Sequence, residues 1–161
     1  MYHKNVDATL TLRSIAEALT DAGLEAILVG NAGAALLGAR VTTMDFDFMI
    51  RQTQANMRKL RDVTRALGGA LWRPFYPVSD MYRLERDDGL QADFLVAMHG
   101  VRSFESLRAK SERLIFNGGW SVVVASLPDI IRSKRAAGRP KDIAVLPELE
   151  ATQREREKIN K

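Results

Sequence analysis

The pattern of apolar and polar residues follows two different periods along the chain, and each period predicts one kind of element. Apolar residues that recur every three or four positions predict helices. Short apolar or alternating runs, several of them bounded by Gly, Asp or Asn, predict strands and hairpins. The expected helices cover residues 8–22, 32–37, 53–67, 103–110, 127–137 and 141–158. The expected strands cover residues 25–29, 44–50, 70–76, 80–85, 90–96, 113–116 and 120–125.

This order of elements mixes helices with short hairpins, which predicts an α+β fold and not a regular alternation of strand and helix. We expect a mixed, mostly antiparallel sheet that is flanked by helices. Residues 1–126 are expected to form the α/β core, and residues 127–161 a C-terminal helical extension packed on it within a single domain. The larger aromatic residues are interpreted as core or strand-face residues, not as a base-stacking platform: Trp72, Phe75, Tyr82 and Trp120.

Two carboxylates alternate with two aromatic residues in the run from Asp45 to Phe48. Because alternate side chains of a strand share a face, Asp45 and Asp47 would point the same way while Phe46 and Phe48 enter the core. Neighbouring carboxylates repel each other unless a cation lies between them. Mg²⁺ suits this need, since it binds carboxylate oxygens, water and substrate phosphates. The alternative is an exposed strand face that carries two solvated acids.

A third acid, Asp93, lies in the middle of the strand-like run from Leu90 to Val96. Asp is unfavourable inside a strand, so its position there needs an explanation. If this strand lies beside that of Asp45 and Asp47, three carboxylates converge and could hold two metal ions. Asp93 could also act as a general base. The alternative is a buried or edge acid paired with an arginine.

Composition and charge narrow the classes of protein to which this chain can belong. A chain of 161 residues with 46% hydrophobic and 27% charged residues is expected to form one globular domain. It contains no run of about 18 apolar residues, and residues 1–7 have no signal-peptide core, so we expect a cytoplasmic protein without a membrane partner. The absence of cysteine excludes disulfides and thiolate metal sites. The net charge of +4 suits nucleotides or RNA as partners, or is simply a basic surface.

Three short motifs, taken in order, resemble the minimal nucleotidyltransferase family of the DNA polymerase β-like superfamily, whose bacterial members include toxin–antitoxin components. They are Val29-Gly30-Asn31, Asp45-Phe46-Asp47-Phe48 and Ala92-Asp93-Phe94. The segments 40–45 and 127–142 are similar to the lead-in and the C-terminal helical tail of bacterial members, so the resemblance covers roughly residues 24–150. One position departs from the family pattern, because Asn31 stands where Gly or Ser is usual.

The resemblance implies a nucleotidyltransferase-like fold and a Mg²⁺-dependent enzyme, with one or two ions. It would move a nucleoside monophosphate from an NTP such as ATP to an acceptor hydroxyl and release pyrophosphate. Asp45, Asp47 and Asp93 would be the catalytic and metal-binding residues. Gly30 and Asn31 would form the phosphate loop, although a plain strand-to-helix turn is the alternative. Arg40 and Lys134 would contact phosphate, unless they are a loop arginine and a solvated helix residue.

The acceptor is left open by the sequence. RNA such as a tRNA end, a partner protein such as a toxin or antitoxin, and small molecules such as aminoglycosides all remain. A second hypothesis is a catalytically inactive, antitoxin-like or nucleotide-sensing interaction module, which Asn31 and the small size favour. A third is a metal-dependent nuclease, which ranks last because the order of the three motifs fits transferases better.

Overall fold

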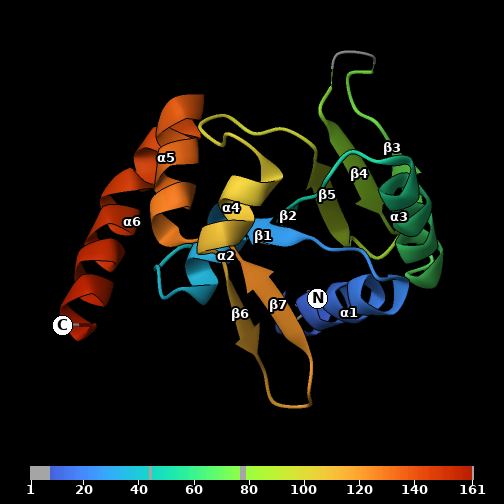
Figure 1. Ribbon diagram of the computed structural model, residues 1–161, viewed down its shortest axis with the longest axis horizontal. Coiled ribbons are helices and arrows are strands. Elements are labelled where there is room, and N and C mark those ends of the chain that lie inside the picture. Colours follow the sequence, from blue (N-terminus) through green and yellow to red (C-terminus); the bar gives the residue numbers. More distant parts are fainter. Residues whose placement is uncertain (1–7, 44, 77–78, 161) are drawn as a thin grey trace, which may run out of the picture.

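A single sheet organises the molecule. The computed structural model describes residues 8–43, 45–76 and 79–160, and within these ranges seven strands pair in the order β3-β4-β5-β2-β1-β7-β6 (Figure 1). The strands are β1 (Ile27–Val29), β2 (Phe46–Met49), β3 (Ala70–Trp72), β4 (Met81–Glu85), β5 (Gln91–Leu95), β6 (Glu112–Ile115) and β7 (Ser121–Val124).

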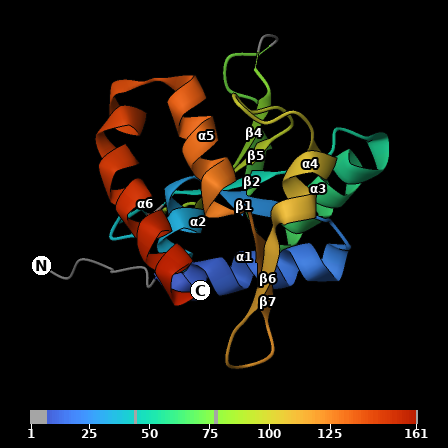
Figure 2. The same cartoon turned by 60° about the vertical axis from the view of Figure 1, so that its left-hand side comes forward.

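Helices cover the sheet from two sides. They are α1 (Ala8–Ala22), α2 (Gly30–Leu36), α3 (Gln54–Ala66), α4 (Phe104–Lys110), α5 (Leu127–Ala137) and α6 (Pro140–Ile159). The first helix, α1, packs against α3, whereas α5 contacts both α2 and α6. Figures 1 and 2 show α5 and α6 side by side at one end of the molecule. No helix in the described part of the chain has the length and apolar character that a bilayer span requires.

Most neighbouring strands run antiparallel, but the two exceptions decide which side chains meet. The parallel pairs are β1 with β7 and β2 with β5. Strand β2 lies in the middle of the sheet, with β5 on one side and β1 on the other. Strand β5 also pairs with β4 in an antiparallel hairpin. The sheet order therefore brings the motif strands 46–49 and 91–95 into direct contact, although some forty residues separate them.

The core face of the sheet carries a row of large apolar side chains across its central strands. Leu28 pairs with Phe48, and Phe48 with Phe94, and all three are almost fully buried. The rings of Phe48 and Phe94 stack with 5.6 Å between their centroids. Since side chains alternate along a strand, this packing fixes the opposite direction for the residues that precede Phe48 and Phe94.

The expected elements are all present, with shifted ends. The acidic strand begins at Phe46, so Asp45 lies just outside it, and Met44 lies outside the described residues. The backbone N–H of Asp45 donates to Oγ1 of Thr43, which gives it a local partner instead of a strand partner. The strand β3, which was expected to reach residue 76, ends at Trp72.

Ser103 and Ser126 cap α4 and α5, because each side chain accepts a backbone N–H of its helix. The assignment of Phe75 to the core or a strand face is wrong. It lies in the turn after β3 with a φ of 59° and is 81% exposed.

The stacked aromatic pair should carry a large share of the stability. We expect Phe94→Ala to lower the free energy of unfolding by about 3–5 kcal/mol, because it leaves a cavity under the central strands. Urea unfolding followed by circular dichroism measures the change. As a matched control, Ile115→Ala should change it by less than about 0.5 kcal/mol, since Ile115 is 76% exposed on the edge strand β6. Equal losses in the two variants would contradict this assignment of the core.

Candidate functional site

Asp47 and Asp93 are direct neighbours on the parallel strands β2 and β5. Residues that pair in register on adjacent strands point to the same face of a sheet, at a strand spacing of about 4.8 Å. Both acids therefore leave the sheet on the face opposite to Phe48 and Phe94. The structure thus brings together the second and third motifs that the sequence singled out.

The carboxylate of Asp47 lies in an unfavourable place for a negative charge. Burial, followed by the charges of Asp93 and Asp45, raises the pKa of Asp47 to about 6 from its usual 3.8, while Lys134 and Lys141 oppose the rise. A cation bound beside Asp47 would stabilise its ionised carboxylate, because it would offset both the lost hydration and the repulsion from the neighbouring acids. Asp47 is thus the centre of the candidate site.

The backbone of Gly30 lies next to the carboxylate of Asp47. A methyl group added at Gly30 would come within 3.0 Å of Oδ2 of Asp47, and the backbone there has a φ of 64°. An L-residue with a side chain would be strained in that conformation and would also crowd the carboxylate. The glycine that the sequence assigns to a phosphate loop therefore lies directly beside the candidate metal ligand.

Asp45 lies at the exposed edge of this group, one residue before β2. Its charge contributes to the raised pKa of Asp47, so the two carboxylates are within electrostatic range of each other. Unlike Asp47, its backbone is held by a local hydrogen bond from Thr43. The two alternating acids therefore differ: one is exposed on a loop, the other is held inside the sheet.

Asp93 is buried and already has a cationic partner. Nε and Nη2 of Arg83 donate to Oδ1 and Oδ2 of Asp93 at 2.8 and 3.1 Å. Arg83 lies directly across the β4–β5 hairpin from Asp93, so the pair is a cross-strand ion pair on the same face. Each carboxylate oxygen has a second lone pair, so this bidentate contact leaves acceptor capacity at Asp93.

Lys134 approaches the acids from helix α5. Its side chain is 12% exposed, and its Nζ lies 3.7 Å from Oδ1 of the buried Asp142. Burial lowers the pKa of Lys134, while the charges of Asp142 and Asp47 act in the opposite direction. A cavity of about 90 Å³ lies among these residues, and its lining includes Gly30, Asp47, Lys134 and Asp142. A cation from the C-terminal extension therefore faces the candidate metal ligand.

Asp142 holds this cation in place. Burial works to raise its pKa, but the hydrogen bonds from Arg139 and the charges of Arg139 and Lys134 outweigh burial, so the pKa of Asp142 lies below its usual value. Nε of Arg139 donates to Oδ2 of Asp142 at 2.5 Å. The junction between α5 and α6 is thus an ionised network next to the site.

The remaining predicted residues, Asn31 and Arg40, differ in how close they lie to the acids. Asn31 is the second residue of α2 and follows Gly30, and its Oδ1 is buried without a hydrogen-bond partner in the described residues. Arg40 is exposed, and its backbone N–H donates to Glu148 on α6. In the described residues, no contact links the Arg40 side chain to Asp47 or Asp93. Arg40 therefore remains a prediction for phosphate binding.

The acids suit a hard divalent cation in their chemistry. Asp45 and Asp47 offer carboxylate oxygens, and the raised pKa of Asp47 marks a place where a cation is needed. Within the described ranges, however, no group of three or more acidic or histidine side chains stands ready to hold a metal ion. Asp93, the predicted third ligand, has both oxygens bonded to Arg83. The fit therefore rests on the pair Asp45 and Asp47.

Sequence reasoning missed two residues of the site, Arg83 and Asp142. A signal for Arg83 was available, because the expected strands 80–85 and 90–96 are separated by only four residues, and a hairpin of these strands brings residues 83 and 93 together. Asp142 follows the helix break at Gly138–Pro140, which gave no indication that its side chain turns inward. Its role follows only from the packing of α6 against α5.

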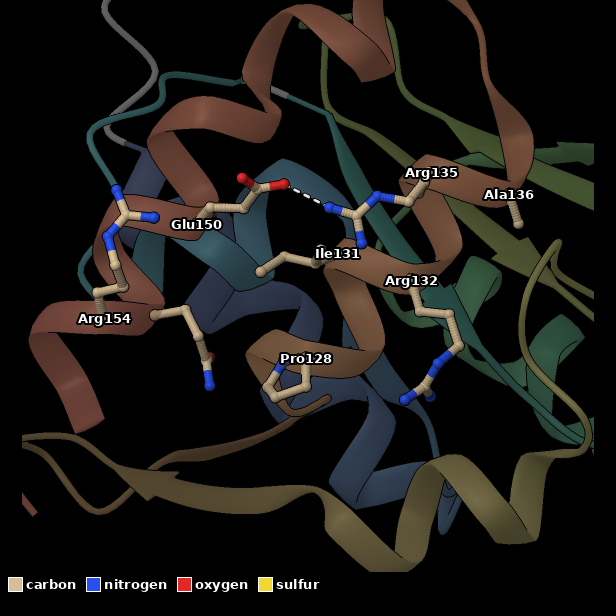
Figure 3. A pocket seen from close by; sticks show the side chains of 8 residues that line it. Pro128, Ile131, Arg132, Arg135, Ala136, Glu150 and Arg154 are labelled. Atoms are coloured by element: carbon tan, nitrogen blue, oxygen red, sulfur yellow. Dashed lines mark hydrogen bonds and ion pairs between the residues drawn. The ribbon is translucent and has the colours of Figure 1, made fainter.

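The opposite face of α5 lines a separate groove of about 640 Å³ (Figure 3). Pro128 and Ile131 lie at its centre, with the guanidinium groups of Arg132, Arg135 and Arg154 around them. Arg135 is paired there with Glu150 of α6. This groove contains none of the site residues that the sequence predicted, and Lys134 points to the other side of the helix.

Comparison with known proteins supports the fold and not a particular activity. No protein-family model matches the chain, and no curated protein matches it. The solved structure of the antibiotic-resistance factor ANT(2'')-Ia matches with a TM-score of 0.61 at 14% identity, over 93% of this chain and 84% of that one. TM1012 of Thermotoga maritima, named as a candidate nucleotidyltransferase, matches with a TM-score of 0.58 at 15% identity, over 99% and 96%.

A third solved structure is an antigenic nucleotidyltransferase-like protein from Paracoccidioides brasiliensis. It matches with a TM-score of 0.50 at 21% identity, over 89% of this chain and 76% of that one. These likenesses confirm the predicted fold class, a mixed α+β, mostly antiparallel sheet with a C-terminal helix, as in nucleotidyltransferase-like structures.

The raised pKa of Asp47 predicts a specific dependence of stability on pH. In the unfolded chain Asp47 ionises near its usual value, but in the folded protein only near pH 6. The protonated form therefore stabilises the fold, and this stabilisation is lost as the pH rises through about 6. Relative to Asp47→Asn, we expect the wild type to lose about 1–3 kcal/mol of unfolding free energy between about pH 4 and pH 8.

Urea unfolding of the wild type and the variant at both pH values, in EDTA, measures this difference. Asp87→Asn is the matched control, because it removes a carboxylate from an exposed turn and should leave the pH dependence as in the wild type. A wild type and Asp47→Asn that lose stability in parallel would show that Asp47 is not held against its charge.

Proposed function

We propose that this protein is a Mg²⁺-dependent nucleotidyltransferase, which moves a nucleoside monophosphate from an NTP such as ATP to an acceptor hydroxyl. The observation that carries the proposal is the register of Asp47 and Asp93 on adjacent parallel strands, with Asp45 in electrostatic range. The fold shared with nucleotidyltransferase-like structures supports it. The three acids then follow the order of the family motifs that the sequence resembles.

In this proposal, Asp45 and Asp47 would hold the metal that accompanies the nucleotide, and the lone pairs that Arg83 leaves free on Asp93 would help to hold a second ion. When bound, Mg²⁺ would supply positive charge to the phosphate oxygens and so favour the transfer. Asp47 is suited to the role because burial and neighbouring acids leave its charge uncompensated. The two hydrogen bonds from Arg83 fix the direction of the Asp93 carboxylate.

The phosphates of the nucleotide lie over Gly30 and Asn31 in the proposed complex. Gly30 allows close approach beside Asp47, and the Asn31 amide can donate a hydrogen bond to an anion. Lys134, and Arg40 from the loop after α2, supply positive charge to the triphosphate. For Lys134, the partner Asp142 limits the motion of a side chain that would otherwise be free to rotate.

The transfer itself is a substitution at the α-phosphorus. The acceptor hydroxyl oxygen forms a bond to the α-phosphorus, and the bond from that phosphorus to the oxygen bridging to the β-phosphorus breaks. The electron pair of that bond leaves with pyrophosphate, and Asp93 accepts the proton of the hydroxyl. The residues contribute mainly by positioning and charge neutralisation. A protein acceptor in this proposal would be the other member of a toxin–antitoxin pair.

A second candidate function is a catalytically inactive module that binds a nucleotide or a partner protein on the same scaffold. Two observations favour it: Asn31 stands in the usual Gly or Ser position, and both oxygens of Asp93 are bonded to Arg83. Isothermal titration with NTP and Mg²⁺, combined with a transfer assay on cell extract using an α-labelled NTP, separates the two. Binding without transfer supports the module.

Loss of the metal ligands should abolish transfer without unfolding the protein. We expect Asp47→Asn and Asp45→Asn each to reduce label transfer at least about a hundredfold. The loss of a carboxylate ligand weakens the binding of the Mg²⁺ that would neutralise the charge on the phosphates. Circular dichroism should be unchanged, since removing one of several like charges relieves repulsion. Asp87→Asn, an exposed turn acid, should transfer label like the wild type. Wild-type transfer by either site variant would disprove the metal assignment.

The departure at Asn31 gives a second test. If this position contacts phosphate, Asn31→Ser restores the residue usual in the family, and transfer should stay equal or rise. The smaller side chain also removes the buried, unpartnered Oδ1. Single-turnover transfer assays and NTP titrations measure the effect. A loss of NTP affinity in Asn31→Ser would show that the asparagine amide is itself the phosphate ligand.

A further inference from the structure

The site acids continue into a row of side chains that crosses four strands. Asp47 pairs with Asp93, Asp93 with Arg83, and Arg83 with Trp72 on the edge strand β3. All four therefore point to the same face of the sheet. At a strand spacing of about 4.8 Å, Trp72 lies about 14 Å from Asp47 along this row. The row leads directly from the edge of the sheet to the candidate site.

The outer part of this face is open to solvent. Helix α3 packs against β3, and the residue of β3 that alternates with the row, Leu71, is partly buried. On the site face Ala70 is exposed, Trp72 is 46% exposed and the Arg83 side chain is 26% exposed. Trp72 therefore presents a large, flat apolar surface on the same face as the candidate site. The open face is thus a candidate docking surface for the acceptor.

Arg83 has donors left for such a ligand. Its Nε and Nη2 donate to Asp93, whereas its Nη1 has no hydrogen-bond partner in the described residues. The guanidinium carbon lies 5.7 Å from the centre of the Trp72 ring. The face therefore presents an aromatic ring and an adjacent guanidinium edge, which is the combination that binds a base and its phosphate in single-stranded nucleic acids.

We propose, in an inference that rests on the proposed function, that the acceptor of the nucleoside monophosphate is the end of a single-stranded RNA. A base stacks on Trp72, a phosphate accepts from Nη1 of Arg83, and the terminal hydroxyl lies at Asp93 and Asp47. The net charge of +4 favours a polyanion. Neither a protein nor an aminoglycoside offers both a nucleobase to stack on Trp72 and a phosphate to accept from Arg83. This use of Trp72 replaces the sequence-based interpretation, which assigned it to the core or a strand face and not to base stacking.

Fluorescence anisotropy with a short labelled single-stranded RNA, in EDTA and without nucleotide, tests the surface apart from the chemistry. We expect the wild type to bind, and Trp72→Ala to weaken binding about tenfold or more, because base stacking is lost. Trp72→Phe should keep most of the affinity. Ile115→Ala removes an exposed apolar side chain from the other edge strand and is the matched control, with unchanged binding.

Arg83→Gln is the second variant, and it should reduce the slope of log affinity against log salt by about one, because one phosphate contact is lost. Arg65→Gln, an exposed arginine of α3, should leave that slope unchanged. Wild-type protein that binds no single-stranded RNA, or Trp72→Ala that binds as tightly as Ile115→Ala, would overturn the proposal. Annealing the RNA to its complement should abolish the Trp72-dependent part of the affinity, and equal dependence on Trp72 for duplex would also overturn it.

The transfer assay keeps this proposal distinct from the proposed function. Asp47→Asn should transfer no label, but its RNA affinity should still fall on the further change Trp72→Ala. Label transferred to a protein or an aminoglycoside, without RNA binding, would reject the RNA acceptor and leave the nucleotidyltransferase intact. RNA binding that depends on Trp72, without label transfer under any condition, would reject the nucleotidyltransferase and leave the RNA surface intact.

Discussion

The forced proximity of Asp47 and Asp93 is the constraint on which the rest of the site depends. Their strands are held in register by the packing on the other face, where Phe48 stacks on Phe94. A shift of either strand by one residue would turn its acid towards the core and its aromatic ring towards the acidic face, so the packing of the apolar face fixes the acidic one. The free energy gained by burying these two rings therefore offsets the repulsion between the carboxylates of Asp47 and Asp93.

The two acids are balanced in different ways, and this difference gives them different chemistry. Asp93 has a permanent cation, because Arg83 reaches it across a hairpin with two hydrogen bonds. Asp47 has the charges of Lys134 and Lys141 at longer range, and Lys134 also pairs with Asp142. The carboxylate of Asp93 is thus already paired, whereas a cation bound beside Asp47 would still stabilise its charge. That asymmetry suits a ligand that arrives with its own metal.

The C-terminal helices contribute more than cover to this arrangement. Helix α5 presents Lys134 to the site on one face and lines the arginine-rimmed groove of Figure 3 on the other. The ionised junction at Arg139 and Asp142 fixes α6 against α5 and orients Lys134 at the same time.

The sequence by itself determined the order and type of the elements and the acids of the site. Periodicity and capping are local signals, so helices such as 127–137 and strands such as 90–96 could be predicted within a few residues, and the alternation of Asp45 with Phe46 assigned its faces. Only the tertiary structure decided what each charge meets. The pairing of Arg83 with Asp93, the inward turn of Asp142 and the exposure of Trp72 depend on sheet order and helix packing. These contacts join residues distant in the chain, and no short window of sequence encodes the burial that raises the pKa of Asp47.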